Sequence, residues 1–397
     1  MGKKVLILGG GFAGVEAAIF LRREKFEVTL ISNRDYLYVY PTSIWIPVKK
    51  IKFEDSCVSM SDLEKSHGFT WVKDEIIEIK AKVGTVICKD QTFSNYDHLI
   101  IALGAGKRQY EGNENFLSIC GAPNEAVQLR DRLDALIEKG GGTIAMGFGG
   151  NPHDKSAVRG GPVFELLFNV NDYLKKKRIR NKFKLVFFAP MENPGAKMGK
   201  KAPEFMDAYY QRLKIDKHVG KPIKRFEEDG IIFKDDTKLM SDYTMYIPAL
   251  QGHNIFYNAS DLPLSEAGFI KINDYFEVQF DDGEAVRKTS VYAIGDSSAL
   301  EGPNWKAKQG HIAEVMARNL AFNISEREKG NDLRKGYKEH LNILCVMDSG
   351  DGAAFVYRNH KREVIFPLPI IGHWMKKGWG WYFKNSKLKK IPRLPGM

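Results

Sequence analysis

The chain has 397 residues, 43% of them hydrophobic, and a formal net charge of +11, which predicts two or three globular domains with an anionic partner and excludes a disordered chain. No apolar run approaches the roughly 20 residues that cross a bilayer, and the first residues lack a signal peptide's layout, so we expect neither a spanning nor an exported protein. The four cysteines form no CxxC pair, which argues against a zinc site, and we expect no metal.

The first glycine motif lies between an expected strand and an expected helix, at residues 4–8 and 15–23. In this GxGxxG, Gly9 allows a tight turn, Gly11 lets the backbone approach a pyrophosphate, and Gly14 lets helix and strand pack closely. The helix N-terminus adds free N–H groups and a partial positive charge. A second strand follows the helix, so the segment predicts a dinucleotide site.

The end of that second strand departs from the usual fingerprint. The acidic residue that would hold an adenosine ribose is replaced by Ser32, Asn33 and Arg34. Ser32 and Asn33 can still bond ribose hydroxyls, and Arg34 can meet a phosphate, with a merely solvated arginine as the alternative. The identity of the dinucleotide therefore stays open at this point.

Two segments follow before the next informative strand. Aromatic residues gather at 36–45, where they suit either a wall over a planar ring or core packing. Polar and apolar residues alternate over 69–89, around a turn at Gly84. This alternation predicts a small β element attached to the first domain.

Two later stretches also bring backbone close to a dinucleotide. YDHLIIALGA is a buried strand that ends at Ala102 and Gly104, and VYAIGDSSAL delivers Gly295 and Asp296 at the end of another. With the opening motif, these stretches resemble the flavoprotein disulfide reductase superfamily. The resemblance implies FAD, in preference to NAD, at the first site, with Asp296 binding the ribityl chain.

The order of these motifs predicts an α/β fold with two Rossmann-like, doubly wound domains and a C-terminal membrane-interface segment. We expect a split FAD-binding domain at 1–115 and 264–330, a second Rossmann-like domain at 116–263, and a C-terminal redox-cysteine and membrane-binding region at 331–397. In the second domain the glycine turn at 147–150 leads into an open stretch, and the next strand lacks a well-placed acidic residue. A pyridine nucleotide therefore has poor anchorage there, and the glycines can serve only to turn the chain.

Over nearly the whole chain, the sequence resembles the sulfide:quinone oxidoreductases, relatives of the type II NADH dehydrogenases. The segments that carry this resemblance are GGGFAG with VTLISNR, GGPVFELLFNVNDYLKKK at 160–177, VYAIGD, KQGHIAEVMARNL at 308–320, and ILCVMDSGDGAAFV at 343–356. The resemblance implies that sulfide is oxidised at cysteines over one face of FAD. It also implies that the electrons pass to a quinone on the other face.

The cysteines match this family incompletely. Cys345 falls on the C-terminal redox cysteine, and Cys120 falls where some members attach FAD through a thioether. The position of the partner cysteine reads Arg159. Either Cys120 takes the second role, or Cys345 works alone through a persulfide, or the donor is a different compound.

Several charged residues are further candidates. Arg159 near a flavin would favour anions, lower the pKa of Cys345 or stabilise the reduced flavin; the alternative is a surface arginine beside a buried core cysteine. Glu165 can move protons, or interact only with its helix dipole. Lys308 matches a lysine that the family places at the flavin pyrimidine, where a cation stabilises developing charge. His311 is a candidate proton donor to the quinone, against a structural role.

The last segment, from residue 370, mixes aromatic and basic residues without an acidic one. Trp374, Trp379, Trp381, Tyr382 and Phe383 suit the headgroup level of a membrane, and lysines favour anionic lipid. Single-stranded nucleic acid is the alternative that we disfavour. The basic residues are Lys376, Lys377, Lys384, Lys387, Lys389, Lys390 and Arg393.

Together these features predict a membrane-associated FAD oxidoreductase that passes electrons from sulfide, or a related sulfur donor, to a membrane quinone. We expect a peripheral protein on the anionic surface of a prokaryotic cytoplasmic membrane, on a side left open, without nucleic acid; a homo-oligomer is also left open. The alternatives are a type II NADH:quinone oxidoreductase and a flavin-binding membrane-surface protein without turnover.

Overall fold

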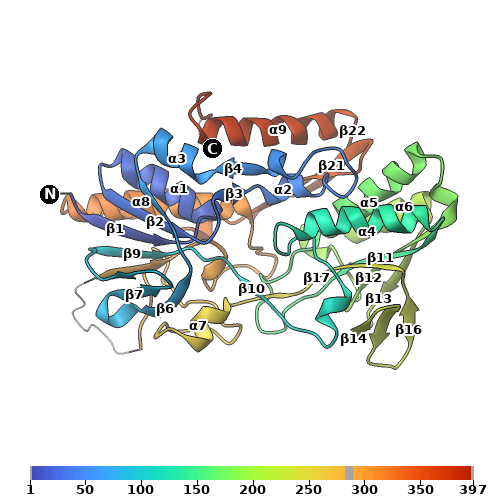
Figure 1. Cartoon of the computed structure of the whole chain (residues 1–397), viewed down its shortest axis with the longest axis horizontal. Helices are drawn as coiled ribbons and strands as arrows, with labels where there is room; N and C mark the ends of the chain where they lie inside the picture. Colours follow the sequence, from blue (N-terminus) through green and yellow to red (C-terminus); the bar gives the residue numbers. More distant parts are fainter. Residues whose placement is uncertain (1, 282–288, 395–397) are drawn as a thin grey trace.

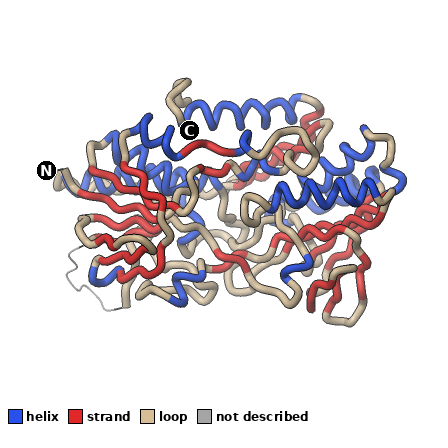
Figure 2. Tube along the Cα trace, in the orientation of Figure 1, coloured by secondary structure: helices blue, strands red, loops and turns tan. Residues whose placement is uncertain are grey.

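The computed structural model describes residues 2–281 and 289–394. Helices and strands alternate along much of the chain, and Figure 2 shows the strands gathered in two groups with loops between them. Each group is built on a parallel sheet with helices against it. The α/β class predicted from the sequence is confirmed.

The first sheet is parallel throughout and has the order β19-β9-β1-β2-β5. Its central strands β1 and β9 are almost entirely buried and mostly apolar, as is typical of a parallel sheet covered on both faces, whereas the edge strand β5 is partly exposed. In chain order they are β1 (Lys4–Leu8), β2 (Glu27–Ser32), β5 (Thr70–Lys73), β9 (His98–Ile101) and β19 (Ser290–Ala293).

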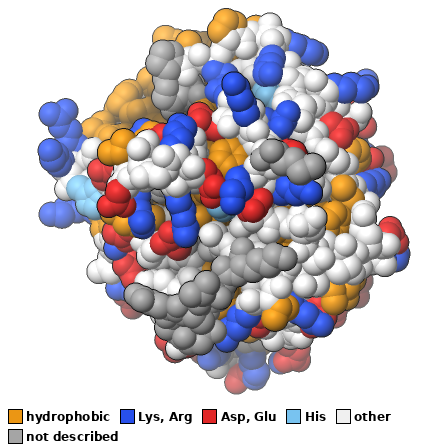
Figure 3. Space-filling view, turned by 90° about the vertical axis from the view of Figure 1, so that its left-hand side faces the viewer, with side chains coloured by type: hydrophobic (Ala, Val, Ile, Leu, Met, Phe, Trp, Pro, Cys, Tyr) orange, Lys and Arg blue, Asp and Glu red, His pale blue; other side chains and the backbone are white. Residues whose placement is uncertain are grey.

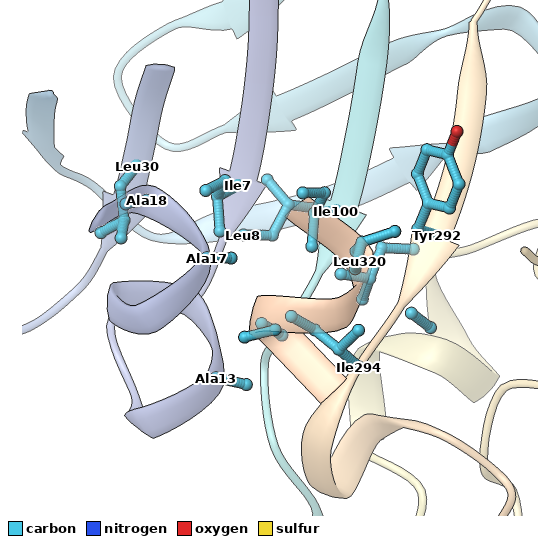
Figure 4. Packing of buried hydrophobic residues seen from close by; sticks show 14 of the residues in the cluster. Ile7, Leu8, Ala13, Ala17, Ala18, Leu30, Ile100, Tyr292, Ile294 and Leu320 are labelled. Carbon is cyan, nitrogen blue, oxygen red and sulfur yellow. The ribbon is translucent and has the colours of Figure 1, made fainter. Parts of the chain in front are cut away.

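Two helices, α1 (Phe12–Arg23) and α8 (Gly310–Glu328), pack together against this sheet. Figure 4 shows small side chains of α1, such as Ala17, facing Ile7 of β1, with Leu320 of α8 closing the same cluster. Small residues let the helices lie close to the strands, so the opening glycine turn is held rigidly between them.

The second sheet is also parallel, in the order β13-β12-β11-β17, and helices lie against it (Figure 1). Its elements are α4 (Glu125–Glu138), β11 (Gly142–Phe148), α5 (Gly161–Lys176), β12 (Phe183–Ala189), α6 (Ala202–Leu213), β13 (Ile215–Val219) and β17 (Tyr243–Ile247). An antiparallel sheet of β14 (Ile223–Glu227), β15 (Gly230–Phe233) and β16 (Lys238–Met240) shares an aromatic core with β12 and β17.

Part of the expectation for 69–89 is wrong. β5 joins the main parallel sheet beside β2, with Ser32 opposite Lys73, and only the later strands form a separate small sheet. Those strands are β6 (Ile76–Lys80), β7 (Thr85–Cys88) and β8 (Thr92–Phe93). The alternating pattern of β5 does not reveal its partner, because the pairing spans 41 residues of sequence, 73 minus 32.

Short elements complete the connections between the sheets. They are β3 (Tyr36–Tyr38), α2 (Tyr40–Ser43), β4 (Cys57–Ser59), α3 (Met60–His67), β10 (Gly106–Lys107), β18 (Leu250–Gln251) and α7 (Asn254–Asn258). Trp45 is buried in the core, which fits the packing alternative for this ring, whereas Tyr38 and Tyr40 both line a cavity.

The C-terminal region adds an antiparallel sheet and a helix: β20 (Ile343–Asp348), β21 (Gly352–Arg358), β22 (Glu363–Pro369) and α9 (Ile371–Lys387). Figure 1 shows α9 along the top of the molecule, above elements from both halves. Among the described residues, no helix combines the length and apolar composition that a membrane crossing needs.

Candidate active site

A cavity of about 1430 Å³ is lined by segments from both parallel sheets, β20 and α9. The loops after β1, β2 and β9 line it, and so do the starts of α5 and α8. The predicted site residues on its wall are Gly9, Gly11, Ser32, Asn33, Arg34, Ala102, Gly104, Cys120, Arg159, Glu165, Asp296, Lys308 and Cys345. The structure thus brings both groups of candidates, cofactor-binding and redox, to one space.

The three glycines of the first motif differ in what surrounds them. A Cβ at Gly9 would overlap the carbonyl oxygen of Ala102, and one at Gly14 would overlap the carbonyl oxygen of Gly9. A Cβ at Gly11 would meet no protein atom within 4 Å. Protein packing therefore explains Gly9 and Gly14, whereas Gly11 faces open space at the uncapped N-terminus of α1, as a pyrophosphate site requires.

Gly295 is packed against α1 and does not line the cavity. It has a φ of +66°, and a Cβ there would lie 3.0 Å from the Cβ of Ala13 on α1. Glycine is therefore required both by the left-handed backbone and by the close approach of α1. Its neighbour Asp296 faces the cavity.

A carboxylate that the sequence analysis missed lies beside Ser32. The N–H of Asp74, directly after β5, donates to the carbonyl of Ser32 at 3.2 Å. Its Oδ1 accepts from the N–H groups of Glu75 at 2.7 Å and Asp90 at 3.3 Å. Its Oδ2 is buried and has no hydrogen-bond partner among the described residues, and Asp74 lines the cavity.

These two features match an FAD. The open space at Gly11 and the partnerless oxygen of Asp74 are what a protein shaped around a phosphate and a sugar hydroxyl would show. A carboxylate that is absent from the end of β2 is thus present directly after the neighbouring strand β5. An acidic residue after a strand is the only signal in the sequence, and it is informative only once the pairing of β2 and β5 is known.

Arg159 precedes α5 and forms an ion pair with Asp296, so it links the two halves across the cavity. Burial raises the pKa of Cys120, and Arg159 and Lys107 partly oppose this. Burial raises the pKa of Cys345 to about 12, with Glu165 adding to the effect and Lys376 opposing it. The expectation that Arg159 lowers the pKa of Cys345 is therefore wrong, because its charge acts at Cys120 instead.

A buried polar network lies next to Cys345. Glu165 on α5 accepts from the N–H of Asp348 at 2.9 Å and forms an ion pair with Lys376 of α9. Asp348 Oδ1 contacts His373 Nδ1 at 2.6 Å, and its Oδ2 accepts from Trp45 Nε1 at 2.7 Å. The sequence analysis did not predict Asp348, His373 and Lys376 as site residues, because α5, β20 and α9 meet only in the fold.

The two carboxyl groups of this network have opposite environments. Burial raises the pKa of Glu165, and Lys376 limits the rise. Hydrogen bonds from His373, Trp45 and Asn169 hold the pKa of Asp348 far below its ordinary value, although burial acts the other way. Asp348 is thus a fixed anion, and Glu165 is the carboxyl group suited to exchange a proton.

Lys308 is buried just before α8, and its Nζ donates to the carbonyl of Ser298. Burial lowers the pKa of Lys308 to about 8, and Asp296 opposes the shift. The first turn of α8 places His311 on the cavity wall, where its Nε2 lies 2.7 Å from Asn342 Oδ1. Burial also lowers the pKa of His311.

Helix α9 has an inner and an outer face. Lys387 forms a buried ion pair with Glu16 of α1, and Arg393 contacts the same carboxylate at 2.6 Å. With Lys376, these residues were expected to meet anionic lipid, and that expectation is wrong for all three. Phe383 also points inward, with its ring 4.9 Å from that of Phe12.

The outer face is apolar and exposed. Ile371, Trp374 and Trp381 are 65%, 65% and 61% exposed, and Met375 beside them is exposed as well. Elsewhere charges are mixed: on the face in Figure 3, Lys and Arg side chains lie among Asp and Glu side chains. The exposed apolar side chains of α9 are therefore a distinct surface, which we call the α9 outer face.

The sequence model of the pyridine nucleotide-disulphide oxidoreductases matches residues 3–317. The chain belongs to the pyridine nucleotide-disulphide oxidoreductase family. As a member of this family it is a flavoenzyme and an oxidoreductase, and the enzyme class expected from the sequence is confirmed.

The relatives to which this chain is most informatively compared are quinone-reducing enzymes by name. The sulfide-quinone reductase of Aquifex aeolicus is 26% identical and aligns over 97% of this chain and 89% of its own. The type II NADH:quinone oxidoreductase of Staphylococcus saprophyticus is 23% identical over 95% of this chain and 98% of its own. The crystal structure of the Aquifex aeolicus sulfide:quinone oxidoreductase superposes with a TM-score of 0.85 at 23% identity, covering 98% of this chain and 92% of its own. The resemblance expected from the sequence is confirmed.

Proposed function

We propose that the chain is a membrane-associated FAD oxidoreductase that passes electrons from sulfide, or a related sulfur donor, to a quinone. One observation carries the proposal: Cys345 and Cys120 line the same cavity as the dinucleotide-binding glycines. The similarity to the sulfide-quinone reductase of Aquifex aeolicus supports it.

The residues proposed to hold FAD come from the first domain. The N-terminus of α1 at Gly11 would take the pyrophosphate, Asp74 and Ser32 the adenosine ribose, and Asp296 the ribityl chain. Lys308 would lie at the pyrimidine end. FAD supplies a two-electron acceptor when it is bound.

Sulfur chemistry is assigned to the cysteines. Burial raises the pKa of Cys345 to about 12, so Cys345 holds its proton at neutral pH and must give it up before its sulfur can act as a nucleophile. Glu165 is adjacent and is the group that exchanges protons with the cavity, while Lys376 holds its position. Cys120, which Arg159 and Lys107 surround with positive charge, is the candidate second sulfur site or the point of covalent attachment.

Quinone access is proposed at α9. Leu344, Phe355, Met375 and Trp379 line the cavity, and Leu344 and Met375 are also exposed. The cavity wall is thereby continuous with the apolar outer face of α9, which suits a headgroup that enters from the membrane. We also propose the domain limits 1–115 with 264–330, 116–263 and 331–397; a homo-oligomer stays a prediction.

One observation weighs against NADH as the donor. A Cβ at Gly149, in the second glycine turn, would overlap the hydroxyl of Tyr246, so packing of the protein accounts for this glycine. Gly161, at the uncapped N-terminus of α5, is as open as Gly11 and lines the cavity, so packing of the protein explains Gly149 alone.

An anaerobic flavin spectrum of the detergent-extracted protein tests the proposal. We expect sulfide to bleach the flavin, a short-chain quinone to restore it, and Cys345→Ser to lose the sulfide step. Bleaching by NADH alone would contradict the proposal and assign the chain to the NADH dehydrogenase branch.

A further inference from the structure

A quinone that enters beside α9 needs protons as well as electrons. Its reduction to a quinol adds two electrons and two protons, and the protons come from water. The proposed entrance is lined by Leu344, Phe355, Met375 and Trp379. None of these side chains titrates, and the entrance borders the apolar α9 outer face. Protons must therefore reach the cavity by another path through the protein.

One series of polar contacts leads from the surface to the cavity wall. The side chain of His373, in the first turn of α9, is 13% exposed, and its Nδ1 lies 2.6 Å from Asp348 Oδ1. The N–H of Asp348 donates to Glu165 Oε1 at 2.9 Å, and Lys376 donates to the same oxygen. Glu165 and Lys376 both line the cavity. Asp348 thus connects a partly exposed imidazole with the carboxyl group on the cavity wall.

Asp348 holds His373 in one orientation. Its Oδ1 accepts from His373, and its Oδ2 accepts from Trp45 Nε1 at 2.7 Å and from Asn169 Nδ2 at 2.9 Å. Because an ionised carboxylate can only accept, Nδ1 of His373 carries a proton, as the histidine of a catalytic triad does beside its aspartate. Among the described residues Nε2 of His373 has no hydrogen-bond partner, so this nitrogen is the one that can exchange a proton with water.

The surroundings of the imidazole contain few charges. The groups that face it are Asp348 of β20, the rings of Trp45 and Trp374 at 5.8 and 6.1 Å between centroids, and Lys376 one turn along α9. Lys50 reaches the same network from another segment, where it donates to Asn169 Oδ1 at 2.9 Å and lies 3.4 Å from Asp172. The charged group that contacts His373 is therefore Asp348.

Close packing already holds the start of α9 in place, without this network. A Cβ at Gly372 would lie 2.5 Å from the Cβ of Ala353 on β21, so helix and strand are in direct contact. The side chains of Glu165, Asp348 and Lys376 are 5%, 0% and 7% exposed, and charged groups buried this deeply lose most of their hydration. A costly polar network beside close apolar packing favours a chemical role over a structural one.

We propose that His373 is the proton inlet of the cavity and delivers protons from water to Glu165 by way of Asp348. His373 takes up a proton at Nε2 and gives up the one at Nδ1 to the Asp348 carboxylate, which passes it to Glu165. Of the two protons that the quinone takes up with its electron pair, at least one comes from Glu165. Glu165 is then anionic until His373 restores its proton.

Asp348 is a positioning residue in this route. Its hydrogen bonds keep its pKa far below the ordinary value, so it holds the proton only in transit. Burial raises the pKa of Glu165, and the charge of Asp348 adds to the rise, which makes Glu165 the acceptor at the end of the route. The role of His373 rests on the proposed reduction of quinone and names the group that supplies it with protons.

The test follows reoxidation of the flavin without a sulfur donor. Full-length, FAD-loaded protein in detergent is reduced photochemically under argon and mixed with a short-chain benzoquinone in a stopped-flow spectrometer. The variants are His373→Ala, with and without added imidazole, and His373→Gln, whose amide can donate to Asp348 but cannot pass a proton on. His360→Ala is the matched control, because His360 is exposed and lies neither on the cavity wall nor in the network.

We expect reoxidation in His373→Ala to be slower by about 100-fold, the lower end of what a positioned acid–base group contributes. Added imidazole should restore the rate in proportion to its concentration, which also shows that the variant is folded. His373→Gln should stay slow, and His360→Ala should match the original protein. An unchanged rate in His373→Ala, no recovery with imidazole, a normal rate in His373→Gln, or equal slowing in His360→Ala would overturn the inlet.

Failure of the proposed function remains distinguishable. If quinone does not reoxidise the original protein, the quinone entrance fails and the inlet fails with it. If quinone reoxidises the original protein and the His373 variants at the same rate, the inlet alone fails. The sulfide assignment is judged separately, by whether sulfide bleaches the oxidised protein.

Discussion

At the scale of single residues, Asp74 makes the sharpest prediction. In Asp74→Asn the remaining oxygen can keep the bonds from Glu75 and Asp90, but the new NH₂ group cannot accept from a ribose hydroxyl. We expect FAD binding to weaken by roughly 1.5–3 kcal/mol, the size of a hydrogen bond to a charged group. Fluorescence titration of the apoprotein with FAD measures the change.

FMN is the matched control ligand, because it lacks the adenosine that Asp74 is proposed to hold. Its affinity should be the same in the original protein and in Asp74→Asn. Equal losses for FAD and FMN would show that Asp74 shapes the loop and does not contact the ribose.

The pKa of Cys345 gives a second prediction at this scale. Burial raises it to about 12, so the thiolate fraction is small at neutral pH and grows as the pH rises. Alkylation of Cys345 by iodoacetamide, followed by mass spectrometry of its peptide, should accelerate steadily from pH 7 to pH 10. A rate that levels off below pH 9 would mean that a neighbouring cation stabilises the thiolate.

The residues of the first glycine motif could be predicted from the sequence because their spacing is local. Gly9, Gly11 and Gly14 are recognisable because one turn needs all three. Asp74 was not predicted because it lies beside the end of β2, which is far from it in the sequence. Arg159 lines the cavity, but its partner, Asp296, is 137 residues away, and spacing in the sequence gives no information on such a contact.

At the scale of elements, the outer face of α9 predicts membrane binding. Trp374→Ser with Trp381→Ser should release the protein from anionic vesicles, since burial of each large side chain contributes roughly 1.5–3 kcal/mol. Cosedimentation with vesicles containing phosphatidylserine measures the bound fraction.

Met240→Ser is the control for this prediction, because Met240 is also exposed but lies on β16, in a different sheet. Its vesicle binding should equal that of the original protein. Unchanged binding of the tryptophan variant would show that another surface meets the membrane.

The elements themselves were predicted well where the pattern is long and local. The strands at β1, β2 and β9 and the helices α5 and α8 lie where hydrophobic periodicity indicates. α1 begins at Phe12, three residues before the expected start. The expected start was set by the hydrophobic pattern, and Gly14, which packs closely in the first turn, is not part of that pattern. For α9, composition predicts a membrane-interface segment but does not reveal its inner face, where Lys376 and Lys387 are buried against acidic partners.

At the scale of the whole molecule, the ion pairs of Glu16 predict how stability depends on pH. Although burial raises it, Lys387 and Arg393 lower the pKa of Glu16 to about 2, from an ordinary value of 4.5. A carboxyl group with a depressed pKa stabilises the fold above its ordinary pKa, and this stabilisation is lost as the pH falls from 4.5 toward 2. The contribution is about 3 kcal/mol.

Lys387→Met removes one partner of Glu16 and should reduce this dependence. Thermal unfolding of the variant and the original protein between pH 6 and pH 3 should show a smaller acid-induced fall in the variant, from a lower starting Tm. A parallel fall in both proteins would mean that Glu16 keeps its pKa without Lys387.

The overall architecture was predictable because the order of three dinucleotide motifs specifies it. Gly11, Gly104 and Asp296 mark the ends of three strands of one sheet, and a chain with these marks in this order has few alternatives. The closure of the cavity was not predictable. It depends on α9, whose contacts with α1 and α5 join residues more than two hundred positions apart.

The inner face of α9 has a practical consequence for anyone who handles the enzyme. A shortened version, cut before residue 371 to avoid detergent, would lose more than the proposed membrane contact of the α9 outer face. Glu165 and Asp348 would each be left in the interior without a basic partner, Glu16 would keep only its ion pair with Arg318, and the cavity would lose a wall. For the same reason the tail cannot be exchanged between relatives as an independent cassette: it has to change together with the acidic residues beneath it.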